Sequence, residues 1–287
     1  MPPKITFVSI IIPAYNEQES IGGVIQDIKK KIHVVKYEIL VVDDGSSDAT
    51  AKHAQKSGVK VISHNRNKGY GASLKSGIKQ AKGDWVLFMD GDGQHTAEDA
   101  LKLLAAPQGA DMVVGQRAQL MHSPFWRMPG KWILRWMANY LTRQRIPDLN
   151  SGLRLVRKDL VDRYLQLCPN GFSFSTTMTM IMYNRGYEIV YVPFEIKKRQ
   201  GKSTVSIATG FDTLLLILRI ATLIDPLRIF IPLSLLIGLI GLLWGIPYAF
   251  LGYGVSVGSM LAVVTAVLLF AIGLISDQIS QLRLEKM

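Results

Sequence analysis

The chain has 287 residues, enough for one globular domain of ordinary size and a smaller appendage. Its formal net charge is +11 and its isoelectric point is about 9.7, so we expect an anionic partner: nucleic acid, a phosphorylated small molecule or a lipid surface. The single cysteine, Cys168, excludes an internal disulfide framework and fits a reducing compartment.

The first hundred residues alternate between short apolar runs and segments with helical spacing of apolar residues. Strands are predicted at 7–13, 38–42, 59–63 and 85–89, each followed by a helix. This alternation is typical of a parallel sheet covered by helices on both faces, in which the loops after the first, second and fourth strands meet at one edge. The side chains expected at that edge are Tyr15, Glu17, Asp43, Asp44, Asp90 and Asp92. An ordinary dinucleotide-binding site is excluded, because no Gly-x-Gly-x-x-Gly follows the first strand.

The fourth strand ends in two acids one residue apart, Asp90 and Asp92, separated and followed by glycines that let the backbone turn sharply. Carboxylate oxygens suit Mg²⁺ or Mn²⁺, which commonly bridge one or two carboxylates to the phosphates of a substrate. Such a cation would also neutralise the acids expected at this edge. The alternative for a lone motif of this kind is a polar turn. The next helix is predicted to begin at Thr96, with Asp99 completing an approximate capping box.

Residues 123–146 break the pattern, because tryptophans and tyrosine alternate there with arginines and lysine. This composition predicts an amphipathic helix lying on lipid headgroups. The alternatives are aromatic side chains packed under the sheet, or a surface for single-stranded nucleic acid. The apolar C-terminus argues against the second alternative, so no nucleic-acid partner is expected. Further strands are predicted at 111–115 and 188–193, and a helix through 178–183 is predicted to end at Gly186.

No charged residue occurs from 229 to 276, and Gly252 and Gly254 divide this run into two apolar segments of about 20 residues, the length that a bilayer requires. Basic residues flank the run on both sides and the connection between the segments has none, so the positive-inside rule places both ends in the cytoplasm. We therefore expect a multi-pass protein of the cell (inner) membrane. A buried core hairpin is the alternative.

The expected organisation has four parts: a cytosolic head at 1–203, a second interface helix at 204–228, two transmembrane helices at 229–276 and a cytosolic tail at 277–287. The cationic loop at 197–203 would enforce this topology, bind anionic lipid or contact substrate. Gly238, Gly241 and Gly245 lie on one helical face and would allow close packing with a second copy, so a homo-oligomer is a further hypothesis.

Short motifs along the head occur in a characteristic order. They are Pro13-Ala14-Tyr15-Asn16-Glu17, Asp43-Asp44-Gly45-Ser46, Asn67-Lys68-Gly69-Tyr70-Gly71, Asp90-Gly91-Asp92-Gly93-Gln94, Gly115-Gln116-Arg117, Ser151-Gly152-Leu153-Arg154 and Arg199-Gln200-Gly201-Lys202-Ser203. Together they resemble the family 2 glycosyltransferases with the GT-A fold, and more narrowly the polyprenyl-phosphate glycosyltransferases, which include dolichol-phosphate mannose synthase. The resemblance implies an α/β, Rossmann-like head that binds a nucleotide-sugar, with a two-helix C-terminal anchor.

The resemblance also implies roles for individual residues. The residues implied to bind the donor nucleotide are Pro13, Ala14, Tyr15, Glu17, Asp43 or Asp44, and Lys68, with Asp90 reached through the metal. The residues implied to hold Mg²⁺ or Mn²⁺ are Asp90 and Asp92, with Gln94 assisting. The candidates to grip phosphate are Arg117, Arg154, Arg199 and Lys202, with a hydrogen bond from Ser203. Asp148 would orient a sugar or the acceptor, or act as a weak base.

The function implied is metal-dependent, inverting transfer of a sugar from a donor of the GDP-mannose or UDP-glucose type to a polyprenyl phosphate. Two motifs of other family 2 branches, Gln-x-x-Arg-Trp and a Glu-Asp pair that would supply a base, are missing, which argues against a processive polysaccharide synthase. A phosphate acceptor needs no strong base, because it is already largely ionised at neutral pH. The alternatives are a membrane-anchored family 2 transferase acting on another lipid, and a catalytically silent nucleotide-sugar sensor.

Overall fold

The computed structural model describes residues 5–106, 109–117, 136, 139–140, 144–195, 222 and 225–285. The chain divides into two compact units, 1–208 and 209–287, and each is described by itself. The expected second interface helix lies almost entirely outside the described residues, and so does most of the expected helix at 123–146.

The first unit is built on a mixed sheet with the strand order β3-β2-β1-β4-β6-β5-β7. Its strands are β1 (Phe7–Ala14), β2 (Lys36–Asp43), β3 (Lys60–Ser63), β4 (Trp85–Phe88), β5 (Met112–Arg117), β6 (Arg154–Arg157) and β7 (Ile189–Phe194). The four strands from the first hundred residues are parallel, as expected. The short strand β6 runs antiparallel between β4 and β5, so the sheet as a whole is mixed.

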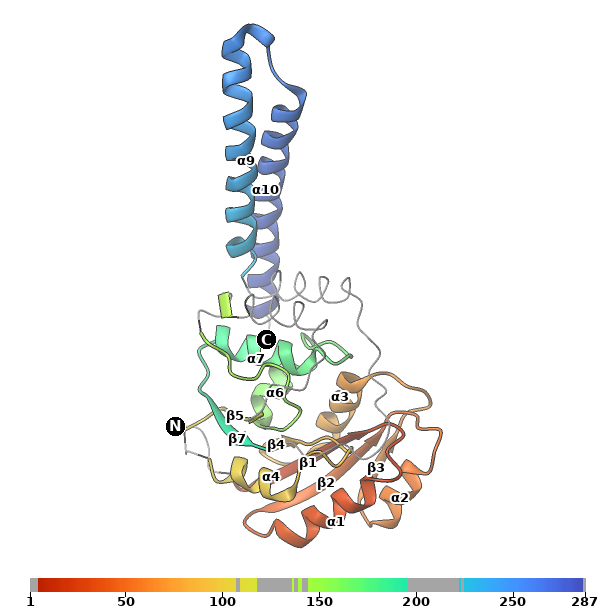
Figure 1. Cartoon of the computed structure of the whole chain (residues 1–287). Helices are drawn as coiled ribbons and strands as arrows, with labels where there is room; N and C mark the ends of the chain where they lie inside the picture. The colour runs from red at the N-terminus through yellow and green to blue at the C-terminus, as the bar shows by residue number, and fades with distance from the viewer. Residues whose placement is uncertain are drawn as a thin grey trace. The chain divides into compact units, whose positions relative to one another are not determined.

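Helices cover both faces of this sheet (Figure 1). The helices are α1 (Ile21–Lys31), α2 (Thr50–Lys56), α3 (Tyr70–Gln80), α4 (Ala97–Leu104), α6 (Lys158–Tyr164) and α7 (Phe174–Asn184). One layer contains α1, which contacts α2 and α4, and the other contains α3, α6 and α7, which contact one another. Strand β1 lies between β2 and β4 and is buried on both faces from Val8 onward, which explains why its sequence is apolar apart from Ser9.

The helix after β4 begins as its sequence predicts. Thr96 is the N-cap of α4, its hydroxyl accepts the N–H of Asp99, and the Asp99 carboxylate accepts the N–H of Thr96 at 3.0 Å. This reciprocal pair satisfies two backbone donors at the start of the helix. It also fixes the point at which the acidic loop after β4 must end.

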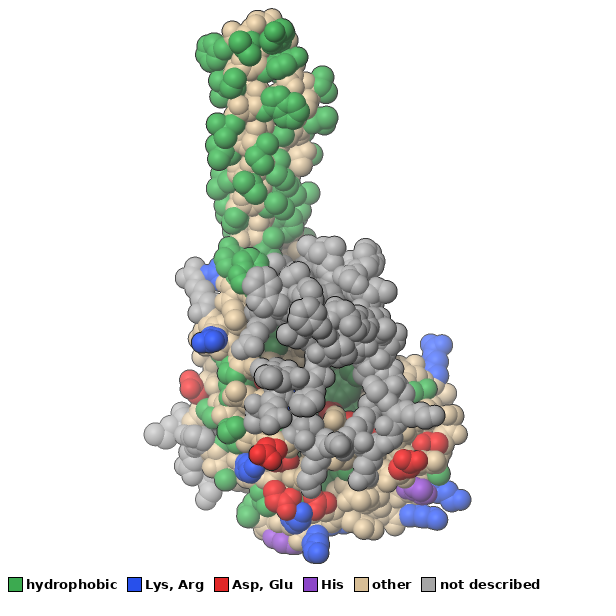
Figure 2. Space-filling model, in the orientation of Figure 1, with side chains coloured by type: hydrophobic (Ala, Val, Ile, Leu, Met, Phe, Trp, Pro, Cys, Tyr) green, Lys and Arg blue, Asp and Glu red, His purple; other side chains and the backbone are tan. Residues whose placement is uncertain are grey.

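The second unit contains two long apolar helices, α9 (Leu227–Tyr248) and α10 (Val257–Glu285), joined through the π-helical turn η2 (Ala249–Tyr253). In the described part of the chain, Leu227–Tyr253 and Val257–Leu282 are long and apolar enough to cross a membrane. Hydrophobic side chains cover the visible surface of this hairpin (Figure 2). Such a surface is compatible with lipid and unfavourable in water. Helix α10 continues past the charge-free run, through Asp277 to Glu285.

The glycine face of α9 packs against α10 within the same hairpin. A Cβ added at Gly241 would lie 3.0 Å from the Cβ of Ala262, and one added at Gly245 would lie 2.7 Å from the Ser259 hydroxyl. Small residues thus let the two backbones approach closely, as in other membrane helix pairs. The expectation that this face packs against a second copy is therefore wrong, because α10 already occupies it.

Candidate active site

The loops after β1, β2 and β4 meet at the carboxyl edge of the sheet. The N–H of Asp44 donates to the carbonyl of Ala14 at 2.9 Å, which joins the ends of β1 and β2. The hydroxyl of Ser20, just after the first loop, donates to the carbonyl of Gly91 at 2.7 Å. These contacts bring together the residues that the sequence placed at one edge.

Asp44 anchors the loop that leads into α3. Its carboxylate accepts the backbone N–H of Lys68 at 2.9 Å and of Gly69 at 2.8 Å, and it lies 2.6 Å from Nδ1 of His64. The Asp44 carboxylate thus contacts three groups of the protein itself. Asp43 makes a local turn, in which its Oδ1 accepts the N–H of Ser46 at 3.2 Å. Lys68, which is exposed, lies on the loop that Asp44 holds.

The loop after β1 docks on the loop after β2. Asn16 has a left-handed backbone (φ 55°), and its side chain accepts the N–H of Ser47 at 2.9 Å. The N–H of Glu17 donates to the hydroxyl of Thr50 at 2.8 Å. Pro13 and Ala14, the last residues of β1, form the base of this loop, with Tyr15 partly exposed above them.

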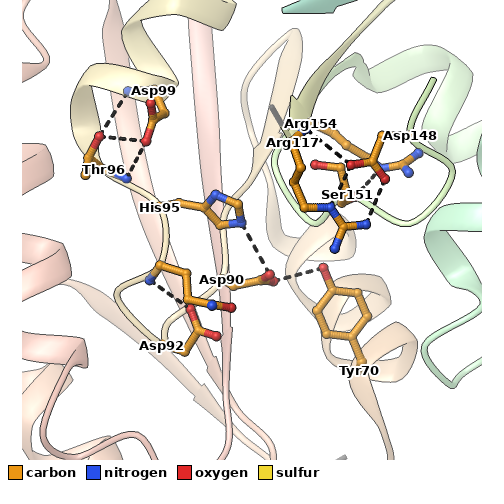
Figure 3. Close-up of polar contacts among 11 residues, drawn as sticks. Tyr70, Asp90, Asp92, His95, Thr96, Asp99, Arg117, Asp148, Ser151 and Arg154 are labelled. Atoms are coloured by element: carbon orange, nitrogen blue, oxygen red, sulfur yellow. Dashed lines mark hydrogen bonds and ion pairs between the residues drawn. The ribbon is translucent and has the colours of Figure 1, made fainter. Parts of the chain in front are cut away.

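Asp90 and Asp92 lie together on the loop after β4 (Figure 3). The hydroxyl of Tyr70 donates to Oδ1 of Asp90 at 3.1 Å, and Nε2 of His95 lies 3.6 Å from Oδ2. Burial by itself would raise the pKa of Asp90, but the hydrogen bonds and charge of His95, the Tyr70 hydroxyl and the charge of Arg117 together hold the pKa below its usual range. Asp90 is therefore ionised at neutral pH.

The donor set fits Mg²⁺ or Mn²⁺. Asp92 is nearly buried and its Oδ1 accepts the N–H of Gln94 at 3.0 Å, which fixes the turn that carries both carboxylates. Among the described residues, no group of three or more His, Cys, Asp or Glu side chains is arranged to hold a metal. Two carboxylates without a closed cage are typical of sites where substrate phosphates and water supply the remaining ligands. Asp90 and Asp92 are the residues that would hold the ion, with Gln94 beside them.

Arg117 and Asp148 form a bidentate ion pair at the same end of the sheet. Nε and Nη2 of Arg117 donate to the two carboxylate oxygens of Asp148 at 2.7 and 2.8 Å. Burial would raise the pKa of Asp148, but the hydrogen bond and charge of Arg117 hold it below its usual range, and the same bond raises the pKa of Arg117. Asp148 is therefore poorly suited to act as a base. It instead holds Arg117, whose side chain is 32% exposed, in a fixed orientation.

Arg154, which the sequence suggested as a phosphate ligand, is 1% exposed. Its guanidinium donates to the carbonyls of Leu149, Ser151 and Ser175, and to the hydroxyl of Thr179. The structure thus corrects the expected role of Arg154 as a phosphate ligand. Its guanidinium N–H groups already donate to protein oxygens inside the core, so the side chain is not placed to bind a substrate. Arg154 instead ties the loop before β6 to helix α7.

The remaining predicted residues, Arg199, Lys202 and Ser203, lie outside the described residues. Conversely, the structure adds Tyr70, His95 and Gly152 to the site, all of which contact or adjoin Asp90. Tyr70 and Gly152 stand inside two of the motifs noted in the sequence, and His95 directly follows a third. Sequence position did not reveal their contacts, because these contacts depend on how separate loops pack.

Comparison with known proteins places the chain in a family. Residues 9–165 match the family described as glycosyl transferase family 2, and residues 225–282 match the GtrB C-terminal hairpin. The chain is 32% identical over 274 residues to a dolichol-phosphate mannosyltransferase of Pyrococcus furiosus, covering 91% of this chain and 76% of that protein. It is 31% identical over 194 residues to an undecaprenyl-phosphate 4-deoxy-4-formamido-L-arabinose transferase of Proteus mirabilis, covering 65% of this chain and 59% of that protein.

A solved structure shares the fold of the head. Glucosyl-3-phosphoglycerate synthase from Mycobacterium tuberculosis, in complex with Mn²⁺, UDP-glucose and phosphoglyceric acid, aligns with a TM-score of 0.61 and 21% identity, covering 76% of this chain and 80% of that one. The mixed α/β sheet is thus a GT-A-like head, and the two apolar helices form the hairpin that accompanies it. The chain belongs to glycosyl transferase family 2 and is a glycosyltransferase with a C-terminal transmembrane hairpin.

Proposed function

We propose that this enzyme transfers a sugar from a nucleotide-sugar to a polyprenyl phosphate, with inversion at the anomeric carbon. The observation that carries the proposal is the pairing of the Asp90–Asp92 loop, in which the pKa of Asp90 is held low, with a fixed arginine, Arg117, in a chain that also has a membrane-spanning hairpin. The dolichol-phosphate and undecaprenyl-phosphate transferases to which the chain is similar support the choice of acceptor.

Asp90 and Asp92 are the residues that would hold Mg²⁺ or Mn²⁺, and the ion would supply positive charge for the donor diphosphate. When bound, this ion would neutralise the charge that grows on the departing nucleoside diphosphate. The carboxylates meet the requirement for such a site because Asp90 stays ionised and the turn at Asp92 is fixed by the N–H of Gln94. Asp43, with Tyr15 and Glu17, contacts the nucleoside.

The acceptor phosphate is bound by positive charge and is not deprotonated by a strong base. A phosphate monoester has its second pKa near about 6, so at neutral pH it is already a nucleophile. It must approach an anionic donor, which requires a cation held in place. Arg117, locked by Asp148 and still accessible, supplies one such cation. Arg199, Lys202 and Ser203 are further candidates from the sequence.

The head and both termini lie on the cytoplasmic side of the cell membrane in this proposal. The support is the distribution of charge, because basic residues flank the hairpin and none lies in its connecting turn. Nucleotide-sugars are the expected donors on that side, and the transfer assay uses both UDP- and GDP-linked sugars.

The test is a transfer assay with radiolabelled UDP- and GDP-sugars, undecaprenyl or dolichyl phosphate, and either Mn²⁺ or EDTA. We expect an organic-extractable, acid-labile product that disappears with EDTA. Transfer only to other lipids would replace polyprenyl phosphate with another acceptor. Donor binding without transfer to any acceptor would overturn the proposed reaction and favour a nucleotide-sugar sensor.

A further inference from the structure

The Asp90 carboxylate is confined on three sides by groups from three different segments. Tyr70, the first residue of α3, donates its hydroxyl to Oδ1 at 3.1 Å, and Nε2 of His95 lies 3.6 Å from Oδ2 (Figure 3). On the third side Gly152 leaves no room for a side chain, since an added Cβ would lie 2.8 Å from both Cγ and Oδ1 of Asp90. The orientation of this carboxylate is therefore set by its neighbours, and Tyr70 makes the shorter of its two polar contacts.

The loop before α7 contacts both the ring of Tyr70 and the backbone next to it. Its ring stacks on Phe172 with the centroids 5.7 Å apart and the planes 15° from parallel. The backbone of the same loop docks on the start of α3, where the N–H of Ala72 donates to the carbonyl of Asn170 at 2.9 Å. Gly71 must remain glycine for this docking, because an added Cβ would lie 2.9 Å from the carbonyl carbon of Asn170. The loop thus fixes both the backbone and the ring of Tyr70.

The phenol hydroxyl of Tyr70 is suited to donate a hydrogen bond to the Asp90 carboxylate. A phenol carries its proton at neutral pH and donates through its O–H, so Tyr70 can serve as the donor in the 3.1 Å hydrogen bond to Asp90. The hydroxyl can then turn its proton toward the ionised carboxylate. This leaves the remaining lone pairs of Asp90 to face an ion.

We propose that Tyr70 is a positioning residue for Asp90, holding the carboxylate in the orientation that binds the divalent ion, and that Phe172 keeps Tyr70 in place by stacking. The inference rests on the proposed function only in that Asp90 binds the ion. Partners that orient a metal-binding carboxylate typically change metal affinity by about 10- to 100-fold when removed.

The experiment measures Mn²⁺ binding without turnover. Free Mn²⁺ is followed by electron paramagnetic resonance as the purified full chain in detergent is titrated, in the presence of UDP and separately of GDP. Tyr70→Phe is compared with Tyr187→Phe, which also removes a tyrosine hydroxyl with hydrogen-bond partners (Tyr164 at 3.1 Å and Arg163 at 3.5 Å) but does so in the segment just before β7. The thermal midpoint of each variant without metal reports any general loss of stability.

We expect Tyr70→Phe to weaken Mn²⁺ binding about tenfold and Tyr187→Phe to leave it within about twofold. Phe172→Ala, which keeps the hydroxyl but removes the stack, should weaken binding in the same direction by a smaller factor, and Phe172→Tyr should restore it. Equal affinities for the wild type and Tyr70→Phe, or equal losses in Tyr70→Phe and Tyr187→Phe, would overturn the proposal. A wild-type chain that binds no Mn²⁺ with either nucleotide would instead overturn the metal site on which the proposal rests.

Discussion

Replacing Gly152 with alanine tests whether the position of the Asp90 carboxylate controls activity. An added Cβ would lie 2.8 Å from Cγ and Oδ1 of Asp90 and closer still to Oδ2, whereas non-bonded carbon contacts are comfortable at about 3.5 Å or more. The carboxylate must therefore move by about 1 Å or rotate away. A displacement of about 1 Å at a reacting centre can cost about 100-fold in rate, which corresponds to about 2.7 kcal/mol in the activation barrier.

The assay is kcat/KM for sugar transfer at saturating Mn²⁺, with the urea midpoint measured in parallel. Gly23→Ala, at an exposed position of α1, is the matched control, because a Cβ added at Gly23 meets nothing within 4 Å. We expect Gly152→Ala to lose about 100-fold in kcat/KM while Gly23→Ala stays within about threefold. A Gly152→Ala enzyme as active as the control would refute the idea that the loop before β6 restrains Asp90.

Three further predictions concern residues that hold the structure around the site and the hairpin. Asp148→Asn should lower the free energy of unfolding at pH 7 by about 2 kcal/mol, because a charged bidentate pair is lost. Because the pKa of Asp148 is lowered in the folded protein, the pair stabilises the fold above the ordinary aspartate pKa of about 4, and this contribution is lost as the pH falls further. The difference in free energy of unfolding between wild type and Asp148→Asn should therefore be smaller in urea melts at pH 3.5 than at pH 7. Arg154→Lys cannot keep all the hydrogen bonds of the buried guanidinium and should cost about 3 kcal/mol in the same melts; a loss below about 0.5 kcal/mol would contradict its structural role. Gly241→Leu should overpack the hairpin against Ala262 by about 1–3 kcal/mol and lower the thermal midpoint in detergent, whereas Leu243→Ala, on an exposed face, should not; unchanged melting of Gly241→Leu would show that the two helices do not pack through this face.

The sequence alone predicted most of the strands and the edge at which the site lies. The run from Ile10 to Ala14 is apolar because β1 is covered on both faces, and Asp90 and Asp92 follow β4 where the chain leaves the sheet. The capping box at Thr96 could also be predicted from the sequence, because its two hydrogen bonds join residues that are only three positions apart. The charge-free C-terminal run predicted a hairpin for the same reason, since its length and composition are local properties.

The tertiary structure alone decided how the polar side chains are used. Both Arg117 and Arg154 look like phosphate ligands in the sequence, but only Arg117 is partly exposed, whereas Arg154 is buried among protein oxygens. Asp148, expected to orient a sugar or the acceptor or to act as a weak base, is the ion-pair partner of Arg117, which is 31 positions away. The insertion of β6 antiparallel between β4 and β5 places the loop before β6 beside Asp90, a result that no local pattern encodes. Hydrophobic periodicity depends on residues that are close together in the chain, so the strands and helices could be predicted from the sequence. The role of a buried charged side chain depends on the distant group that lies next to it after folding. The roles of Arg117, Asp148 and Arg154 could therefore not be predicted from the sequence.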